Sequence, residues 1–427
     1  MAINRRDVLK IAGAGVTLAG AGPLASSLAR AQAKTGGPIQ LGFISSLTGA
    51  QAPLGQPMLM GAQIAVDQIN QAGGVNGRKL ELVVRDDKAK PTDATIASRE
   101  LAGNGVNLQL GVVSSAVALA LTAMLEQQKA ILITCAAHSD KLTKENFNRH
   151  YFRVTDNPYM KLRFMAAAVA ERYGSVSRWS GVIPDHEYGR TTWNCFEEGL
   201  LEYYPTVAKA KPAIAQAVRT QYGATDYRNV IGSAMGLPAE GFLVSVYGGD
   251  AVTLFKQALP YGFFKKAKVI IDPANEFVVA KAMKSEMPEM WCGTHWYAGA
   301  FTDLPMSNAV LKEHIRRTNG DAFPTGWVGE GHAAVMAYAK AIQASGTTET
   351  QAVIKALESE TFDTTCGPRY FRKEDHQAIK PVLMYRLRGS KSASAGFEVL
   401  EFIKKDGKDF VDPPTPGKAL TFKYVTV

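Results

Sequence analysis

The sequence predicts an α/β protein of two lobes, each built on a parallel-rich sheet flanked by helices. Short apolar runs alternate with amphipathic segments along most of the chain, a pattern typical of parallel strands covered by helices on both faces. This alternation starts again with the helix expected at residues 160–173. A single sheet with that many strands would be strained, so two successive units predict two lobes.

The strands are predicted where runs rich in aliphatic and β-branched residues are bounded by turn residues. In chain order these runs cover residues 39–45, 80–85, 108–113, 130–134, 179–183, 241–247 and 267–271. Helices are predicted where apolar residues recur at helical spacing, at residues 58–71, 92–104, 119–129, 160–173, 189–203, 226–235, 251–259, 307–317, 330–344 and 348–359. A strand-rich segment, 369–427, is expected to complete one or both lobes.

The composition excludes several classes of protein. Hydrophobic residues make up 46% of the 427 residues and charged residues 20%, which excludes wholesale disorder and a membrane protein with many spans. The net charge of +9 is spread along the chain, and its densest cluster, residues 265–268, is short. Because nucleic-acid binding needs a sustained basic face, we expect no nucleic-acid partner.

Residues 1–33 have the features of an export signal. Arg5 and Arg6 precede an uncharged stretch, 11–29, and Ala31-Gln32-Ala33 is a small-residue cleavage site. The paired arginines resemble the twin-arginine signal, which predicts export of the folded chain to the periplasm. The alternative is a retained membrane anchor, which the glycine-rich, weakly hydrophobic stretch disfavours.

The chain lacks the common motifs of catalysis and cofactor binding. It has no P-loop, no G-x-S-x-G elbow and no H-E-x-x-H pair, so we expect no cofactor, no metal and no enzymatic activity. The four cysteines form no C-x-x-C unit. They allow one or two disulfides, although Cys135 lies in an apolar run and is expected to be a buried thiol.

Ligands of open α/β sheets bind at the carboxyl ends of the strands. The loops that follow the predicted strands are polar, aromatic or glycine-rich, and they cover residues 45–57, 114–116, 135–140, 184–190, 248–250 and 272–276. We therefore expect a ligand-binding cleft between the two lobes.

Two adjoining segments identify a family. Residues 41–65 (LGFISSLTGAQAPLGQPMLMGAQIA) and 66–87 (VDQINQAGGVNGRKLELVVRDD) resemble the periplasmic binding proteins of branched-chain amino acid ABC transporters, the type I periplasmic binding proteins. Shorter matches occur at Tyr247-Gly-Gly-Asp and at Cys366-Gly-Pro-Arg-Tyr-Phe. The resemblance extends over roughly residues 38–381.

The resemblance implies a receptor whose two lobes are joined by three crossings, near residues 155–157, 296–299 and 380–382. Lobe 1 would comprise residues 38–156 and 299–380, and lobe 2 residues 157–298 and 381–427. Such a protein captures a small-molecule ligand and delivers it to the permease subunits of an ABC transporter in the inner membrane. We expect a monomer.

The resemblance also implies site residues. Lobe 1 would hold a ligand carboxylate through Ser115, Ala136 and His138, and lobe 2 would contribute Tyr188 as an aromatic cover and Asp250. Neighbouring candidates from the cleft loops are Leu54 and Ser114. Each has a structural alternative, because the two serines and Asp250 could cap helices and Tyr188 could lie on the surface.

Two positions depart from the family pattern. His138 stands where amino-acid binders carry a hydroxyl residue, and it could donate to a carboxylate. The acid that meets a ligand ammonium could be Asp272 or Glu276, or it could be missing. We therefore expect a small carboxylate-bearing metabolite, which could be an amino acid, an amide or an aromatic or other organic acid, and the departures favour an organic acid or amide over leucine. The rival functions are a ligand-sensing receptor on the same scaffold and an exported α/β enzyme.

Overall fold

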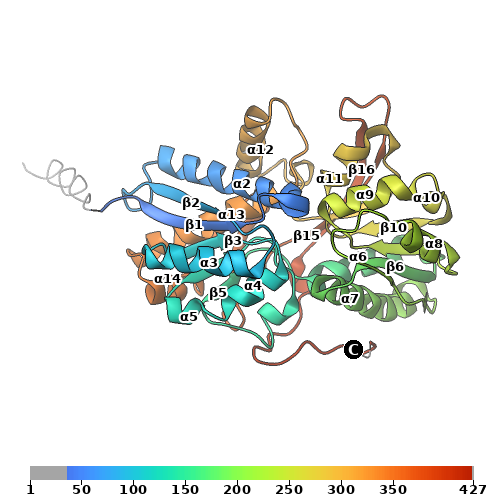
Figure 1. Ribbon diagram of the computed structural model, residues 1–427, viewed down its shortest axis with the longest axis horizontal. Helices are drawn as coiled ribbons and strands as arrows, with labels where there is room; N and C mark the ends of the chain where they lie inside the picture. Colours follow the sequence, from blue (N-terminus) through green and yellow to red (C-terminus); the bar gives the residue numbers. More distant parts are fainter. Residues whose placement is uncertain (1–35, 426–427) are drawn as a thin grey trace, which may run out of the picture.

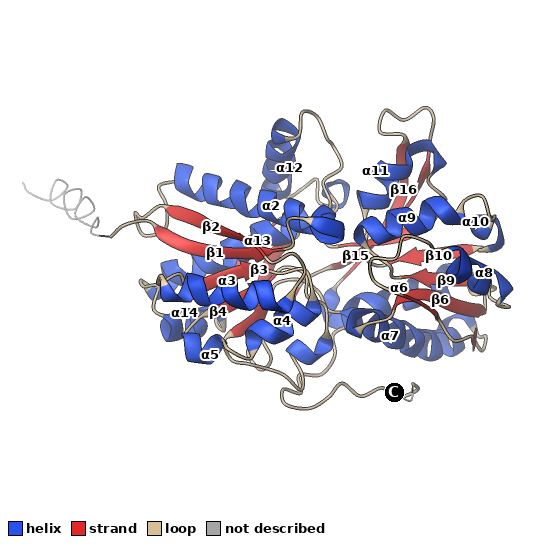
Figure 2. Ribbon diagram, viewed as in Figure 1, coloured by secondary structure: helices blue, strands red, loops and turns tan. Residues whose placement is uncertain are grey.

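Two β-sheets, one in each half of the molecule, organise the residues that the computed structural model describes, 36–425 (Figure 1). In Figure 2 the strands of each half lie between layers of helices. The two-lobed α/β fold class is confirmed. The predicted export signal, residues 1–33, lies outside the described residues.

The first sheet is entirely parallel, with the order β2-β1-β3-β4-β5. Apart from the edge strand β2, of which only Leu80 is buried, its strands are mostly apolar and buried, as expected of strands covered on both faces. They are β1 (Ile39–Ser45), β2 (Leu80–Asp86), β3 (Leu108–Gly111), β4 (Ile131–Thr134) and β5 (Tyr151–Arg153).

Helices cover both faces of this sheet. One face packs against α2 (Ala52–Gln71), α13 (Gly326–Ser345) and α14 (Thr350–Leu357). The other face packs against α3 (Pro91–Gly103), α4 (Ser115–Thr122) and α5 (Leu125–Gln128). A small antiparallel sheet and one further helix complete this lobe: β12 (Thr361–Thr364), β13 (Gly367–Phe371), β14 (Ala378–Ile379) and α12 (Pro305–Arg317).

The second sheet has the order β16-β15-β11-β10-β9-β6-β7, with β8 beside β6. The strands from β6 to β11 pair in parallel, whereas β15 and β16 are antiparallel additions at one edge. The strands are β6 (Arg178–Pro184), β7 (Ala213–Ile214), β8 (Val218–Thr220), β9 (Gly241–Val244), β10 (Val269–Asp272), β11 (Met290–Thr294), β15 (Val382–Gly389) and β16 (Phe397–Lys405).

Helices also cover both faces of the second sheet. On one face lie α6 (Pro158–Arg172) and α7 (Glu187–Tyr203). On the other lie α8 (Arg228–Gly236), α9 (Gly248–Ala258), α10 (Phe263–Lys266) and α11 (Phe277–Met283). The remaining turns of helix are η1 (Gly49–Gln51), η2 (Asp140–Leu142), η3 (Tyr204–Ala208), η4 (Lys284–Glu286), η5 (Ala298–Ala300) and η6 (Gly407–Asp409).

The chain passes between the sheets three times, after β5, after β11 and after β14. The segment after η6 contacts both halves. In it Asp412 pairs with Lys144 of the first half, and the amide of Lys423 donates to Glu198 of α7 at 2.7 Å. The residue boundaries expected for the lobes stay a prediction.

Several elements differ from the prediction. Helix α2 begins at Ala52, within the loop expected at 45–57, because Pro53 occupies the first turn, where its missing N–H costs nothing. The helix expected at 119–129 is two helices, α4 and α5. The first begins at Ser115 because the Ser114 side chain caps it, accepting from the amide of Val117 at 3.5 Å.

All four cysteines are free and buried, so the disulfides that the sequence allows do not form, and the expected buried thiol at Cys135 is confirmed. From residue 36 to residue 425, no helix is both long and apolar enough to cross a membrane.

Candidate ligand-binding site

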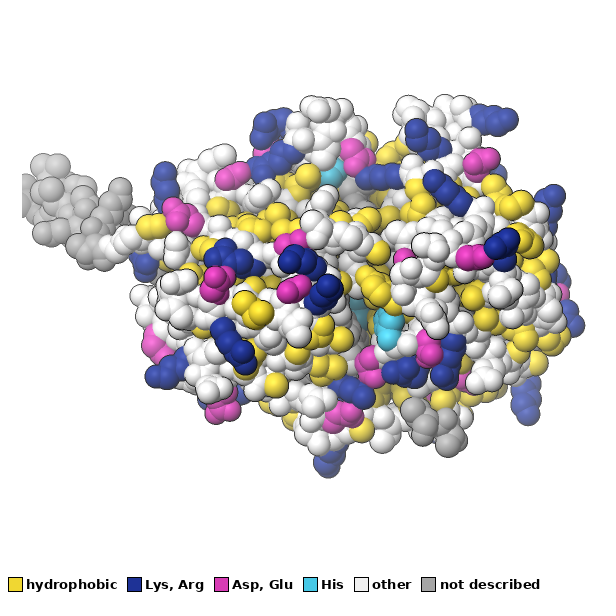
Figure 3. Space-filling view, viewed as in Figure 1, with side chains coloured by type: hydrophobic (Ala, Val, Ile, Leu, Met, Phe, Trp, Pro, Cys, Tyr) yellow, Lys and Arg dark blue, Asp and Glu magenta, His cyan; other side chains and the backbone are white. Residues whose placement is uncertain are grey.

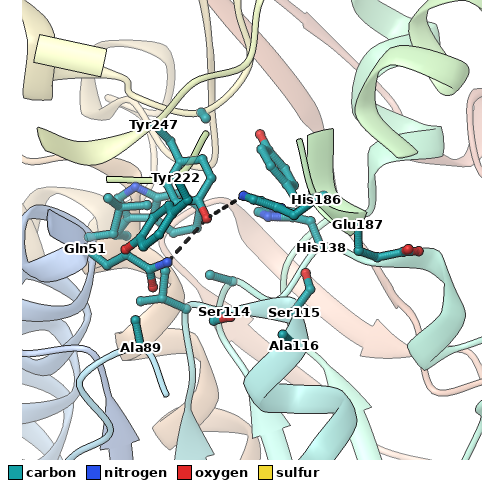
Figure 4. Close-up of a pocket in the computed structure, with 16 residues that line it drawn as sticks. Gln51, Ala89, Ser114, Ser115, Ala116, His138, His186, Glu187, Tyr222 and Tyr247 are labelled. Atoms are coloured by element: carbon teal, nitrogen blue, oxygen red, sulfur yellow. Dashed lines mark hydrogen bonds between the residues drawn. The ribbon is translucent and has the colours of Figure 1, made fainter. Parts of the chain in front are cut away.

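A cavity of about 300 Å³ lies between the two halves, at the carboxyl ends of strands from both sheets. Figure 3 shows histidine side chains at the hollowed boundary between the halves, and Figure 4 shows the lining side chains. These are Gln51, Leu54, Ala89, Val113, Ser114, Ser115, Ala116, Ala136, His138, His186, Glu187, Tyr188, Tyr222, Tyr247, Ala274 and Trp327.

The first half presents hydrogen-bond donors to this cavity. The Ser115 hydroxyl oxygen accepts from the amide of Ser139 at 3.1 Å, which leaves its O–H free to donate. The amide of Ala136 makes no hydrogen bond within residues 36–425. Ala116 lies in the first turn of α4, where backbone N–H groups have no partner inside the helix. Hydroxyl and amide donors at a helix start suit a carboxylate.

The second half presents aromatic rings. The Tyr188 and Tyr247 rings meet edge to face, with centroids 5.3 Å apart, and Tyr222 lies 6.3 Å from Tyr247. The His186 ring meets Tyr247 at 5.9 Å. Figure 4 shows the rings of Tyr222, Tyr247 and His186 opposite the serines of the first half. This wall offers apolar area and edge-to-face contacts to a flat ligand.

Hydrogen bonds join the halves across the cavity. The Gln51 amide donates to the Tyr247 hydroxyl at 3.3 Å, and that hydroxyl also lies 3.3 Å from Nε2 of His186 (Figure 4). The Ser139 hydroxyl donates to Glu187 at 3.3 Å. The structure therefore has the two halves in contact around the cavity.

The carboxylates near the cavity are already engaged by the protein. Among the described lining residues, Glu187 is the only acid, and it pairs with Lys141 at 3.4 Å. Asp272 accepts from the amide of Ala274 at 2.9 Å, and Asp250 accepts from the amide of Gly223 at 2.7 Å. Within residues 36–425, the cavity wall thus offers no free carboxylate to a ligand ammonium.

A buried polar cluster lies behind His138. Its Nε2 is 3.1 Å from Nε2 of His295 and 3.5 Å from Oδ1 of Asp156. Lys161 places Nζ 2.7 Å from that same nitrogen of His295 and 3.4 Å from Asp156. On the opposite side of the His295 ring, Nδ1 lies 2.8 Å from Oε1 of Glu276. We call these five residues the hinge cluster.

The hinge cluster, together with the neighbouring Lys380, connects the three passages between the sheets. Asp156 follows β5, His295 follows β11, and Lys380 lies between β14 and β15. Lys380 lies 3.8 Å from Asp156 and 3.0 Å from Glu330, and Glu330 pairs with Arg369 at 2.6 Å. All of these side chains are buried, so the cluster combines dense charge with exclusion of water at the junction of the lobes.

Burial and charge shift the pKa values here in opposite directions. Burial lowers the pKa of His138 to about 3, which makes this side chain neutral at physiological pH. Burial opposes the charged form of Asp156, but the positive charges of Lys161 and Lys380, together with the hydrogen bond from His138, hold the pKa of this carboxyl well below its usual range. The cluster therefore contains a neutral histidine beside a permanent carboxylate.

The ring nitrogens of His138 and His295 and the Asp156 carboxylate lie within 4.8 Å of one another, a spacing that suits a metal ion. However, the Lys161 ammonium lies within hydrogen-bond distance of the His295 nitrogen that a metal would need. The ammonium also supplies the positive charge that balances Asp156. We therefore treat the group as a hydrogen-bonded ion cluster.

Comparisons with known proteins identify the family. The model of the family described as "Periplasmic binding protein" matches residues 38–393.

This chain belongs to the periplasmic binding protein family.

The leucine-, isoleucine-, valine-, threonine- and alanine-binding protein of Pseudomonas aeruginosa is 26% identical to this binding protein over 332 residues, which is 77% of this chain and 84% of that protein. The protein of the same name from Brucella ovis, in a closed conformation, has a TM-score of 0.76 at 17% identity, over 90% of this chain and 100% of that one. A solute-binding protein of an R. palustris ABC transporter, in complex with benzoate, has a TM-score of 0.75 at 16% identity, with the same coverage.

Six of the eight predicted site residues of this binding protein line the cavity: Leu54, Ser114, Ser115, Ala136, His138 and Tyr188. Asp272 and Asp250 do not line it. Asp272 is fully buried and shapes its own loop, and Asp250 lies in the first turn of α9 and holds the loop at Gly223. Backbone amides therefore bond one oxygen of each carboxylate, and the Asn275 side chain bonds the second oxygen of Asp272.

The sequence interpretation missed several cavity residues. Gln51 and Glu187 lie in predicted cleft loops and carry polar groups, a signal that could have identified them. Tyr222 follows the short edge strand β8, and Trp327 lies inside a helix. Nothing in the local pattern of those two residues indicates that their side chains face a cavity.

Proposed function

We propose that this chain is the solute-binding protein of an ABC importer, exported to the periplasm by its twin-arginine signal. It captures a small carboxylate that lacks a free ammonium group and has an apolar or aromatic body. The closed protein then delivers this ligand to permease subunits in the inner membrane. No chemical step is part of this function.

The observation that carries the proposal is the distribution of polar groups around the cavity. The Ser115 hydroxyl and the Ala136 amide are available donors, so a carboxylate bound there would be hydrogen-bonded and shielded from water. A bound ammonium would need an acceptor of negative charge. Among the described lining residues only Glu187 is acidic, and Lys141 already pairs with it.

The relatives support the transport role and a choice of ligand. The Pseudomonas aeruginosa protein is by its name a binding protein for leucine, isoleucine, valine, threonine and alanine, and the R. palustris structure contains benzoate. An aromatic acid agrees better with the ring-lined wall formed by Tyr188, Tyr222 and Tyr247. The cavity of about 300 Å³ also suits a small ligand.

The mechanism follows from the placement of the two walls. The carboxylate donors belong to the first half and the rings to the second, so a ligand contacts both only when the halves close. A ligand with higher affinity for the closed form shifts the population toward it. The hydrogen bond from Gln51 to Tyr247 across the cavity would form in the same closure.

The test uses pairs of ligands that share a carbon skeleton and differ only in the ammonium group. Thermal shift and calorimetry on the mature chain would compare 3-phenylpropionate with phenylalanine, and 4-methylpentanoate with leucine. We expect the acids without ammonium to stabilise the protein and the amino acids not to do so. Preferential binding of the amino acids would refute this ligand class, and conversion of a ligand to a new product would indicate an enzyme.

A further inference from the structure

The hinge cluster determines which nitrogen of His138 carries its proton. Lys161 has three acceptors for its three N–H groups: Nε2 of His295 at 2.7 Å, the carbonyl of Pro273 at 3.4 Å and Asp156 at 3.4 Å. A lysine amine is ordinarily more basic than an imidazole by about four pKa units. Burial lowers the pKa of Lys161, but the Asp156 and Glu276 carboxylates favour its charged form, so the proton between Lys161 and His295 stays on the lysine. His295 therefore accepts at Nε2.

The opposite side of His295 agrees with this assignment. Its Nδ1 lies 2.8 Å from the Glu276 carboxylate, so this nitrogen carries the N–H and donates it. A neutral His295 then presents a lone pair at Nε2 toward Lys161 and His138. Oδ1 of Asp156 also lies 3.3 Å from this nitrogen, and the Lys161 ammonium, 2.7 Å from the nitrogen and 3.4 Å from the carboxylate, supplies the positive charge that both acceptors need. The Glu276 carboxylate also accepts from the backbone amide of His295 at 3.0 Å, which fixes the ring orientation.

His138 directs its own Nε2 at two acceptors, the His295 lone pair at 3.1 Å and the Asp156 carboxylate at 3.5 Å. A lone pair at this nitrogen would face two other lone pairs, so Nε2 carries the hydrogen. A neutral imidazole with Nε2–H has its lone pair at Nδ1. Within residues 36–425, that Nδ1 makes no hydrogen bond, and His138 lines the cavity.

We propose that Nδ1 of His138 accepts a hydrogen bond from the ligand, so the ligand carries a hydroxyl or amide N–H in addition to its carboxylate. This inference rests on the proposed function, since it concerns the same cavity. It reverses the role expected from the sequence, in which His138 donates to the carboxylate. Trp327 and Tyr188, with ring centroids 5.8 and 6.1 Å from His138, border the place where that donor binds.

The first experiment uses sets of three aromatic carboxylates that carry hydrogen, hydroxyl or methoxy at one ring position. A hydroxyl can donate, whereas a methoxy group of similar polarity can only accept. Calorimetry with the ortho, meta and para sets should show, for one position, about ten- to hundredfold tighter binding of the hydroxyl compound than of either partner. Equal binding within every set refutes the inference but leaves the proposed function intact. Absence of binding by all of the acids refutes the proposed function itself.

A pair of variants localises the effect. His138→Phe keeps a ring but removes the acceptor, so the preference for hydroxyl should disappear. His186→Phe is the matched control, because His186 also lines the cavity but has its Nε2 next to the Tyr247 hydroxyl. The control should keep the preference. The inference is wrong if the preference persists in His138→Phe or is lost only in His186→Phe.

A direct measurement does not depend on the ligand. Two-bond ¹H–¹⁵N correlation spectra of the protein labelled with ¹⁵N-histidine distinguish the two neutral tautomers. We expect one histidine that is absent from the His138→Gln spectrum to show the Nε2–H form, with and without EDTA. An Nδ1–H form, or a change on addition of EDTA that indicates a metal at Nε2, would overturn the inference, because Nδ1 would then be a donor.

Discussion

Replacement of Asp156 by asparagine tests the energetic role of the hinge cluster. The carboxylate is fully buried, and the ammonium groups of Lys161 and Lys380 lie 3.4 and 3.8 Å from it. Asp156→Asn keeps the shape of the side chain but removes its charge. One positive charge then remains buried without its counter-ion at the junction of the two lobes.

The magnitude follows from the distances. With an effective dielectric constant of about 20, a pair at 3.4 Å attracts by about 5 kcal/mol. Measured costs of removing one partner of a buried pair are about 3–5 kcal/mol, because the remaining charge is uncompensated. We therefore expect Asp156→Asn to lower the free energy of unfolding by about 3–5 kcal/mol.

The assay is urea unfolding followed by tryptophan fluorescence, with Glu398→Gln as a control. Glu398 pairs with Arg388 at 2.9 Å, but both side chains are exposed, so its loss should change the free energy of unfolding by less than about 1 kcal/mol. A shift in Asp156→Asn no larger than in this control would refute the reasoning.

The pH dependence has a definite sign. The pKa of Asp156 is lower in the folded protein than in the unfolded chain. The carboxylate therefore stabilises the fold fully at any pH above its pKa in the unfolded chain. This stabilisation is lost only as the pH falls through its pKa in the folded protein. The difference in unfolding free energy between the wild type and Asp156→Asn should therefore be constant between about pH 5 and pH 8. A difference that changes across this range would contradict the assignment of a permanent carboxylate.

Three further predictions concern the cavity and the thiols. Ser115→Ala should weaken binding of the preferred acid about ten- to hundredfold in calorimetry, because it removes a donor to a charged group. Ser114→Ala should leave the affinity unchanged and lower helix stability by about 1 kcal/mol, because it removes a helix cap. Gly248→Ala should disfavour the closed form, because the φ of Gly248 is +64° and an added Cβ would lie 2.5 Å from the carbonyl of Ala50. Weaker ligand binding, together with a larger radius of gyration in X-ray scattering of the protein with ligand, would confirm this. All four cysteines are buried, so a thiol reagent should label none in the native protein and all four after unfolding, and rapid native labelling would contradict the structure.

The fold class and the general place of the site follow from the pattern of residues along the chain. Strand β1 is the apolar run expected at residues 39–45, because strands covered on both faces need continuous apolar residues. The loops after such strands converge at one edge, so Ser115, Ala136 and Tyr188 could be assigned to the cleft before any coordinates. The sequence did not predict the shortest strands, because so few residues give no clear pattern. Strand β5 has three residues, and the edge strands β7 and β8 have two and three residues.

Only the tertiary structure decided the chemistry of the site. Asp272 and Glu276 are acids in the right loop, but backbone amides and His295 already use their oxygens. Nothing near His138 in the sequence reveals that Asp156 and His295 face its Nε2. The local sequence pattern indicates burial and periodicity, whereas the proton position and the free hydrogen-bonding groups depend on Asp156 and His295, which come from two separate crossings. For that reason the sequence predicts where a ligand binds, and the kind of ligand that we propose follows from the packed hinge cluster.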